Sequence, residues 1–147
     1  RDQPRSRGLG DVYKRQMDNT VIKNLIYNQL FAAANYDLIA TIAPDDPTKT
    51  RILNFSADCK NNANMLDRIY QEENTSSYHP IVQKPQFHGS FIESIHWMLN
   101  YEGDSFRLFH INSFYDVYTT AQRQLLTYIA GILNDHAIGL THISLTK

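Results

Sequence analysis

The sequence predicts an all-α protein, an antiparallel four-helix bundle with a long crossover between its second and third helices. The first observation is that four segments repeat apolar side chains at steps of three and four residues, the period of an amphipathic helix. The second is that one connection, residues 73–89, is long and contains two prolines, whereas the others are short. Short connections make neighbouring helices antiparallel, and the long one allows the helices on either side of it to run parallel.

The first helix is expected over residues 20–43. Its apolar stripe is formed by Ile22, Ile26, Leu30 and Ala33. Pro44 ends the helix because proline lacks the backbone N–H that a helix interior requires. Asp46 followed by Pro47 then predicts a new helix, since a capping carboxylate before a proline in the first turn is typical of a helix start.

The second helix is expected over about residues 47–72. Its stripe consists of Ile52, Phe55, Cys59, Asn62, Leu66 and Ile69. The alternating steps of three and four residues are typical of a bundle seam. Cys59 and Asn62 interrupt this seam, because neither is a hydrocarbon side chain.

The third and fourth helices each contain one charged or titratable residue in an otherwise apolar stripe. The sequence SFIE at residues 90–93 predicts a capping box at the start of the third helix, and the glycine and aspartate at 103–104 are expected to kink or break it. Its stripe is Ile92, Ile95, Leu99, Glu102, Phe106 and Phe109. The fourth helix is expected over residues 114–144, with the stripe Tyr118, Ala121, Leu125, Tyr128, Ile132, His136 and Leu140. Glu102 and His136 are the residues that interrupt these two apolar stripes.

Residues 1–16 differ from the rest of the chain. They contain five basic and two acidic residues, show no helical or strand period, and are followed by Met17. The segment resembles a translated sequencing adaptor, so we expect a disordered, artefactual tail before a single domain at residues 17–147. The alternative is a natural basic arm that contacts an anionic surface.

Charge and composition narrow the class of protein. The whole chain carries −1, so residues 17–147 carry −4 and offer no basic patch for nucleic acid. No apolar run approaches the roughly 20 residues of a membrane span, and no secretory signal is evident. A single cysteine excludes an internal disulfide and favours a reducing compartment. These features together predict a cytoplasmic protein with no nucleic-acid or membrane partner.

Two stretches carry a resemblance to a known family, YNQLFAAANYDLIATIAPDD and the following ILNFSADCKNNANMLDRIY. With the four helix lengths and the central crossover, residues 17–147 resemble the ferritin-like superfamily, nearest to its rubrerythrin-type or bacterial spore-coat-like members. The resemblance implies a bundle fold, self-association in a coat-like assembly, and a spore-associated location as one possibility beside the cytoplasm. It also implies a di-iron site in the bundle core.

The ferritin-like di-iron site needs one glutamate from each of two helices and a Glu-x-x-His pair from each of the other two. The matching positions here are Phe31 or Ala32 in the first helix, Cys59 and Asn62 in the second, Glu102 in the third, and Leu133 and His136 in the fourth. The only glutamates of the chain are Glu72, Glu73, Glu93 and Glu102. No register of the helices can therefore assemble four glutamates, and the predicted di-iron site is degenerate.

Glu102 and His136 are the best remaining candidates for a site. They can hold one divalent metal ion, with Asp135, Cys59 or water as further ligands, or they can form a buried hydrogen-bonded pair that neutralises its own charges. Cys59 is either a soft metal ligand or a small inert hydrophobe. Asn62 is interpreted as the relic of a ligand position or as a residue that fixes helix register.

The leading hypothesis is a non-catalytic bundle with a structural or interaction role, without a cofactor, that associates with itself or with a protein partner. Phe114, Tyr115 and Tyr118 are the candidate surface for that association. The alternative is a metal-binding protein or oxidoreductase with a non-standard mononuclear site at Glu102 and His136, holding iron or another divalent metal.

Overall fold

The computed structural model describes the backbone of residues 4–147 and the side chains of residues 19–147. The four helices are α1 (Pro4–Ala40), α2 (Asp46–Glu73), α3 (Phe91–Asn112) and α4 (Thr120–Thr146). The described part of the chain contains no strand, and the prediction of an all-α four-helix bundle is confirmed. Among the same residues, no helix combines the length and apolar character needed to cross a bilayer.

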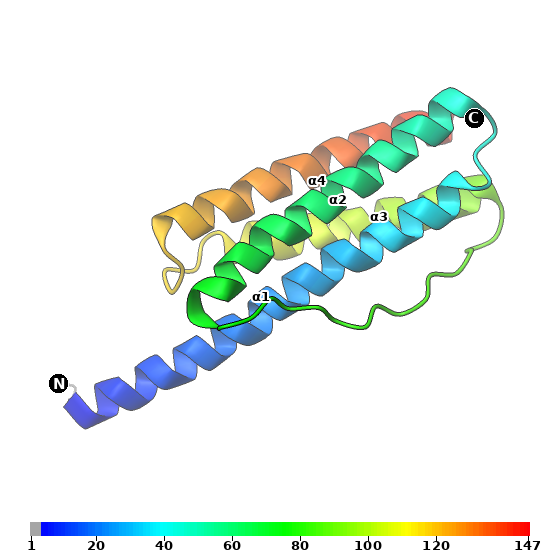
Figure 1. The fold of residues 1–147 in the computed structure, drawn as a ribbon. Helices are drawn as coiled ribbons and strands as arrows, with labels where there is room; N and C mark the ends of the chain where they lie inside the picture. The colour runs from blue at the N-terminus through cyan, green and yellow to red at the C-terminus, as the bar shows by residue number, and fades with distance from the viewer. Residues whose placement is uncertain (1–3) are drawn as a thin grey trace.

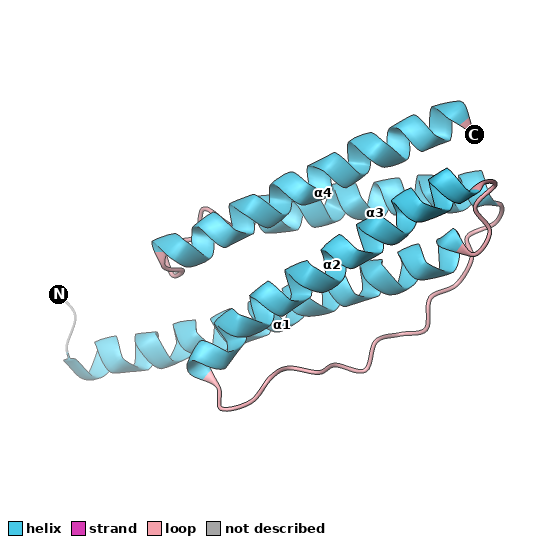
Figure 2. Cartoon of the chain, turned by 45° about the horizontal axis from the view of Figure 1, so that its top comes forward, coloured by secondary structure: helices cyan, strands magenta, loops and turns pink. Residues whose placement is uncertain are grey.

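The bundle is built from two helical hairpins. α1 packs mainly against α2 and α3 mainly against α4. α1 and α4 run in one direction and α2 and α3 in the other, because the crossover returns the chain to the end of the bundle where α2 began (Figure 1). The crossover passes along the outside of α1 (Figure 2), where the backbone N–H of Gln83 donates a hydrogen bond to the Tyr27 hydroxyl at 2.9 Å.

The helix starts follow local capping chemistry. Asp45, rather than the predicted Asp46, caps α2 by accepting a hydrogen bond from the N–H of Thr48 at 2.8 Å. This hydrogen bond, together with an ion pair to Lys147 at 2.9 Å, lowers the pKa of Asp45 to about 2. The predicted capping box at Ser90 and Glu93 is present at the start of α3. The ion pair between Asp45 and Lys147 also connects the end of α4 to the start of α2.

Three boundaries differ from the sequence prediction. α3 is continuous through Gly103, because an isolated glycine weakens a helix without breaking it. α4 begins at Thr120 instead of 114, since a capping box of Thr119 and Gln122 sets its start. The backbone of residues 4–16 is helical where a disordered tail is predicted, because a nucleated helix can extend one residue at a time.

The first turns of α1 project past the ends of the other helices (Figure 1). Residues 1–3, and the side chains of residues 1–18, lie outside the described residues. The interpretation of residues 1–16 as an artefactual tail therefore stays a prediction.

The sequence predicted the buried face of α2 more accurately than those of α3 and α4. All six predicted positions of α2 are buried. In α3 and α4 the buried stripe is rotated from the prediction, so that Met98 and Leu126 are buried while Leu99 and Leu125 are only half-buried. Tyr128, predicted to be in the core, is exposed. A helix turns by about 100° per residue, so adjacent apolar residues define two overlapping stripes, and the partner helix selects one.

A close approach between α2 and α4 depends on Gly139. A Cβ atom at this position would lie 2.7 Å from the Phe55 ring, whereas a Cβ at Gly131 of the same helix would meet nothing within 4 Å. Phe55 cannot withdraw freely, because its ring is packed against those of Tyr36 and His136 at centroid distances of 5.5 and 4.7 Å.

We therefore expect Gly139→Ala to lower the free energy of unfolding by about 1–2 kcal/mol, because overpacking outweighs the gain in helix propensity. The matched control Gly131→Ala should leave the free energy of unfolding unchanged or raise it by up to about 1 kcal/mol. Urea unfolding followed by circular dichroism measures both. Equal stabilities of the two variants would contradict the close approach.

Candidate functional site

A layer of polar side chains crosses the middle of the core, with one residue from each helix. Its members are Gln29, Asn62, Glu102 and His136, each at most 1% exposed. One apolar cluster surrounds Leu25, Leu66 and Leu133 on one side of the layer, and another surrounds Ile39, Ile52 and Leu140 on the other. We call these four residues the polar layer.

Each hairpin contributes a hydrogen-bonded pair to the polar layer. In the first hairpin the Asn62 side-chain amide donates to Gln29 Oε1 at 3.0 Å. In the second, His136 Nδ1 lies 2.8 Å from Glu102 Oε2. Buried polar groups are stable only when they are paired, so these contacts explain how four polar side chains can be placed in the core.

His136 bridges two carboxylates. Besides Glu102, its Nε2 lies 2.8 Å from Oδ2 of Asp58, whose side chain is 51% exposed. Burial alone would lower the pKa of His136, but the hydrogen bond and charge of Glu102, followed by those of Asp58, outweigh burial and raise the pKa. His136 therefore connects Asp58 at the surface of α2 with Glu102 in the core.

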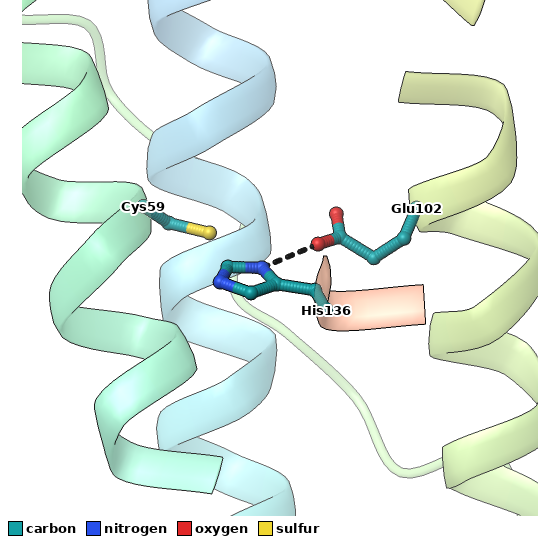
Figure 3. Close-up of side chains that lie close together, drawn as sticks. All are labelled: Cys59, Glu102 and His136. Carbon is teal, nitrogen blue, oxygen red and sulfur yellow. Dashed lines mark hydrogen bonds and ion pairs between the residues drawn. The ribbon is translucent and has the colours of Figure 1, made fainter. Parts of the chain in front are cut away.

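Cys59 completes the group. One ligand atom each of Cys59, Glu102 and His136 lies within 4.8 Å of the others, and all three residues are buried. Figure 3 shows the Cys59 side chain directed from α2 toward the His136 ring, which in turn points to Glu102 on α3. Burial, and then the charges of Glu102, Asp58 and Asp37, raise the pKa of Cys59, so the free side chain is a protonated thiol. The three residues could hold one metal ion.

Tyr36 of α1 borders the same group. Burial and then the charge of Glu102 raise its pKa well above the ordinary value. Hydrogen bonding to Glu102 also contributes to this rise, although the Tyr36 hydroxyl lies outside strict hydrogen-bond geometry. Glu102 Oε1 is buried without a hydrogen-bond partner. One oxygen of the Glu102 carboxylate is therefore paired with His136, and the other is unpaired.

The geometry excludes the four-glutamate arrangement of a di-iron site. Among the described residues Glu102 is the only buried carboxylate. Asn62 is hydrogen-bonded to Gln29, and Leu133 contributes only an apolar side chain to the core. Two adjacent metal ions need several carboxylates to bridge and neutralise them, and the residues present do not provide them.

The candidates taken from the sequence are brought together in part. Glu102, His136 and Cys59 form one buried group, whereas Asp135 lies on the exposed side of α4. The contact of Asp58 with His136 was missed, because Asp58 flanks the seam and is itself exposed. Tyr36 was missed because an aromatic residue at helical spacing gives no sign of a polar role.

No protein-family model matches the chain, and no curated protein is similar to it. Among solved structures, the fold is similar to that of "Hypothetical Protein Pfu-1136390-001" from Pyrococcus furiosus, with a TM-score of 0.72 and 14% sequence identity. The similarity covers 86% of this chain and 87% of that one. At this identity the likeness establishes the four-helix fold alone.

Removing one member of the Glu102–His136 pair should lower the free energy of unfolding more than replacing both members by apolar residues. His136→Leu leaves the Glu102 charge buried without its partner and should lower the free energy of unfolding by about 3–5 kcal/mol. The double variant Glu102→Met/His136→Leu removes both charges and should recover at least about half of that loss.

Chemical unfolding of the wild type, the single variants Glu102→Met and His136→Leu, and the double variant measures the coupling. Asp58→Asn, at an exposed partner, is the control and should change stability by less than about 1 kcal/mol. Additive losses in the double variant would show that Glu102 and His136 do not depend on each other.

Proposed function

We propose that this chain is a ferritin-like bundle that has lost dinuclear iron chemistry and acts as a structural or interaction module. The observation that carries the proposal is the content of the polar layer, which has one carboxylate, one imidazole and two neutral amides. Amides cannot neutralise metal cations or act as acids or bases near neutral pH. The hydrogen bonds within each hairpin support a role of these residues in holding the fold.

The absence of a four-glutamate site from the core leads to a direct test with iron. Anaerobically purified protein mixed with ferrous ion and then with oxygen should oxidise iron no faster than the buffer control, because no paired carboxylate site is available to hold two ions. Optical absorbance of ferric ion and metal analysis of the recovered protein measure this. Two irons held per chain, or fast oxidation, would overturn the proposal.

The proposed interaction role is supported by an exposed apolar strip at the end of α3 and in the following turn. Phe114 is 70% exposed, and Ile111 and Tyr115 are about half exposed. His110 packs edge-to-face against Phe114 at a centroid distance of 5.0 Å. Tyr118, included in this surface by the sequence analysis, is buried and is removed from it. Exposed aromatic residues gathered in this way are typical of association surfaces.

We expect the protein to self-associate through this strip. Phe114→Ser/Tyr115→Ser should shift sedimentation-velocity profiles toward the monomer, because the variant removes apolar area that association would bury. Leu145→Ser, which changes an apolar residue at the end of α4 that is even more exposed, at 81%, is the control and should not shift them. A wild-type monomer at all concentrations, or equal behaviour of both variants, would contradict the expectation.

A second candidate function is metal binding, or oxidoreductase activity, at a mononuclear site. The specific observation in its favour is that Glu102 and His136, with Cys59, lie near one point in the core. Iron or another divalent metal is the cofactor this candidate implies. In this function the bundle would hold one ion, which is compatible with the loss of the two-ion site.

A further inference from the structure

We propose that Cys59, Glu102 and His136 form a site selective for one borderline-soft divalent cation such as Zn²⁺, and that Asp58 positions His136 for it. This inference rests on the second candidate function, mononuclear metal binding, and names the class of metal and a positioning residue. It does not need the site to be catalytic.

The donor set determines the class of metal. Thiolate, imidazole and carboxylate are the three side-chain ligands that Zn²⁺ takes in proteins, and Co²⁺ accepts the same set. Ca²⁺ and Mg²⁺ are hard cations that take oxygen ligands, of which this group has only the carboxylate of Glu102. A sulfur, a nitrogen and an oxygen donor at one point therefore favour Zn²⁺ over the hard ions.

The spacing of the donors is close to that of a bound ion. The bond lengths of Zn²⁺ place tetrahedral ligand atoms about 3.3–3.8 Å apart. The three donors lie within 4.8 Å of one another, and His136 Nδ1 is 2.8 Å from Glu102 Oε2. Small side-chain movements would bring the three donors to an ion. The His136–Glu102 contact would open slightly, and the Cys59 sulfur would move toward these two residues.

An unpaired carboxylate oxygen gives an independent sign of a ligand. Glu102 Oε1 is buried and has no hydrogen-bond partner, while the other oxygen of the same carboxylate contacts His136. A buried polar atom without a partner is unfavourable, and in a native protein it calls for an explanation such as an ion. A cation bound by Glu102 would satisfy this second oxygen. The Tyr36 hydroxyl lies beside the same carboxylate.

Asp58 supplies the outer contact that metal-binding histidines require. Its carboxylate accepts a hydrogen bond from His136 Nε2 at 2.8 Å. Nδ1, which now contacts Glu102, is therefore the ring nitrogen that a metal would take when that contact opens. A carboxylate behind a ligating histidine holds the ring in place, and its loss typically weakens metal binding about 10- to 100-fold. Asp58 is half exposed and does not touch the proposed ion position, so it acts through His136.

The charges of the three ligands match a divalent cation. A metal takes cysteine as the thiolate and histidine as the neutral imidazole, so binding releases protons. The Cys59 thiolate and the Glu102 carboxylate then supply two negative charges, which balance the two positive charges of the ion.

The experiment titrates the full chain, reduced and freed of metal, with Co²⁺ as the optical probe and then with Zn²⁺ as competitor. We expect one Co²⁺ per chain, an absorption band of cobalt bound to thiolate, and displacement by Zn²⁺. Cys59→Ser should abolish the band. Asp58→Asn should weaken Zn²⁺ binding about 10- to 100-fold at unchanged stoichiometry. Asp135→Asn, which removes an exposed carboxylate adjacent to His136, is the matched control and should bind as the wild type does.

The possible outcomes distinguish selectivity for Zn²⁺ from mononuclear metal binding in general. Binding of Mn²⁺ or Mg²⁺ in preference to Zn²⁺, or a Co²⁺ complex without a thiolate band in the wild type, overturns the selective site but leaves mononuclear binding standing. Failure of all these ions to bind overturns both. An equal loss of affinity in Asp58→Asn and Asp135→Asn would remove the positioning role of Asp58. The wild-type spectrum keeps the test valid if Cys59→Ser fails to fold.

Discussion

The placement of four polar side chains in one layer of the core is the constraint on which the rest of the structure depends. A buried amide or charge is unfavourable unless it is paired, so each member of the layer needs a partner at the right height in the bundle. Asn62 finds Gln29 within the first hairpin, and His136 finds Glu102 within the second. A shift of one helix against the other by one turn, within either hairpin, would separate these partners. The polar layer therefore fixes helix register more firmly than the apolar clusters on either side of it, which tolerate sliding.

The same layer limits the chemistry of the core. The Glu102 carboxylate and the His136 imidazolium cancel each other's charge, while Gln29 and Asn62 carry none. A core with this content is close to neutral and can remain dry, whereas a two-metal site requires several carboxylates that repel one another until the ions arrive. The layer holds only one buried carboxylate, so its polar side chains can satisfy one another by hydrogen bonds without a pair of ions.

Buried positions could be predicted where a polar residue interrupts an apolar stripe of a helix. They could not be predicted where two apolar stripes overlap on the same helix. Cys59, Asn62, Glu102 and His136 were identified because a polar residue at a seam position is conspicuous, and all four are buried. The rotated stripes of α3 and α4 could not be predicted, since pairs such as Leu125 and Leu126 are equally apolar and only the partner helix distinguishes them. The contact of Asp58 with His136 joins residues on α2 and α4 whose separation along the chain is 78, and no local pattern records it.

Cys59 and Asn62 look equivalent in the sequence, since both interrupt the same seam, but their surroundings separate them. The Asn62 amide nitrogen donates to Gln29 inside its own hairpin, so its contact belongs to the packing of α1 on α2. Cys59 is directed across the bundle to the pair formed by the other hairpin (Figure 3). With Asp58, it is where the first hairpin reaches the Glu102–His136 pair of the second. An inert hydrophobe would serve packing equally well at this position, whereas a sulfur beside an imidazole and a carboxylate adds a third donor from a third helix. The arrangement across the bundle, and not the presence of a thiol, is what makes Cys59 a candidate ligand.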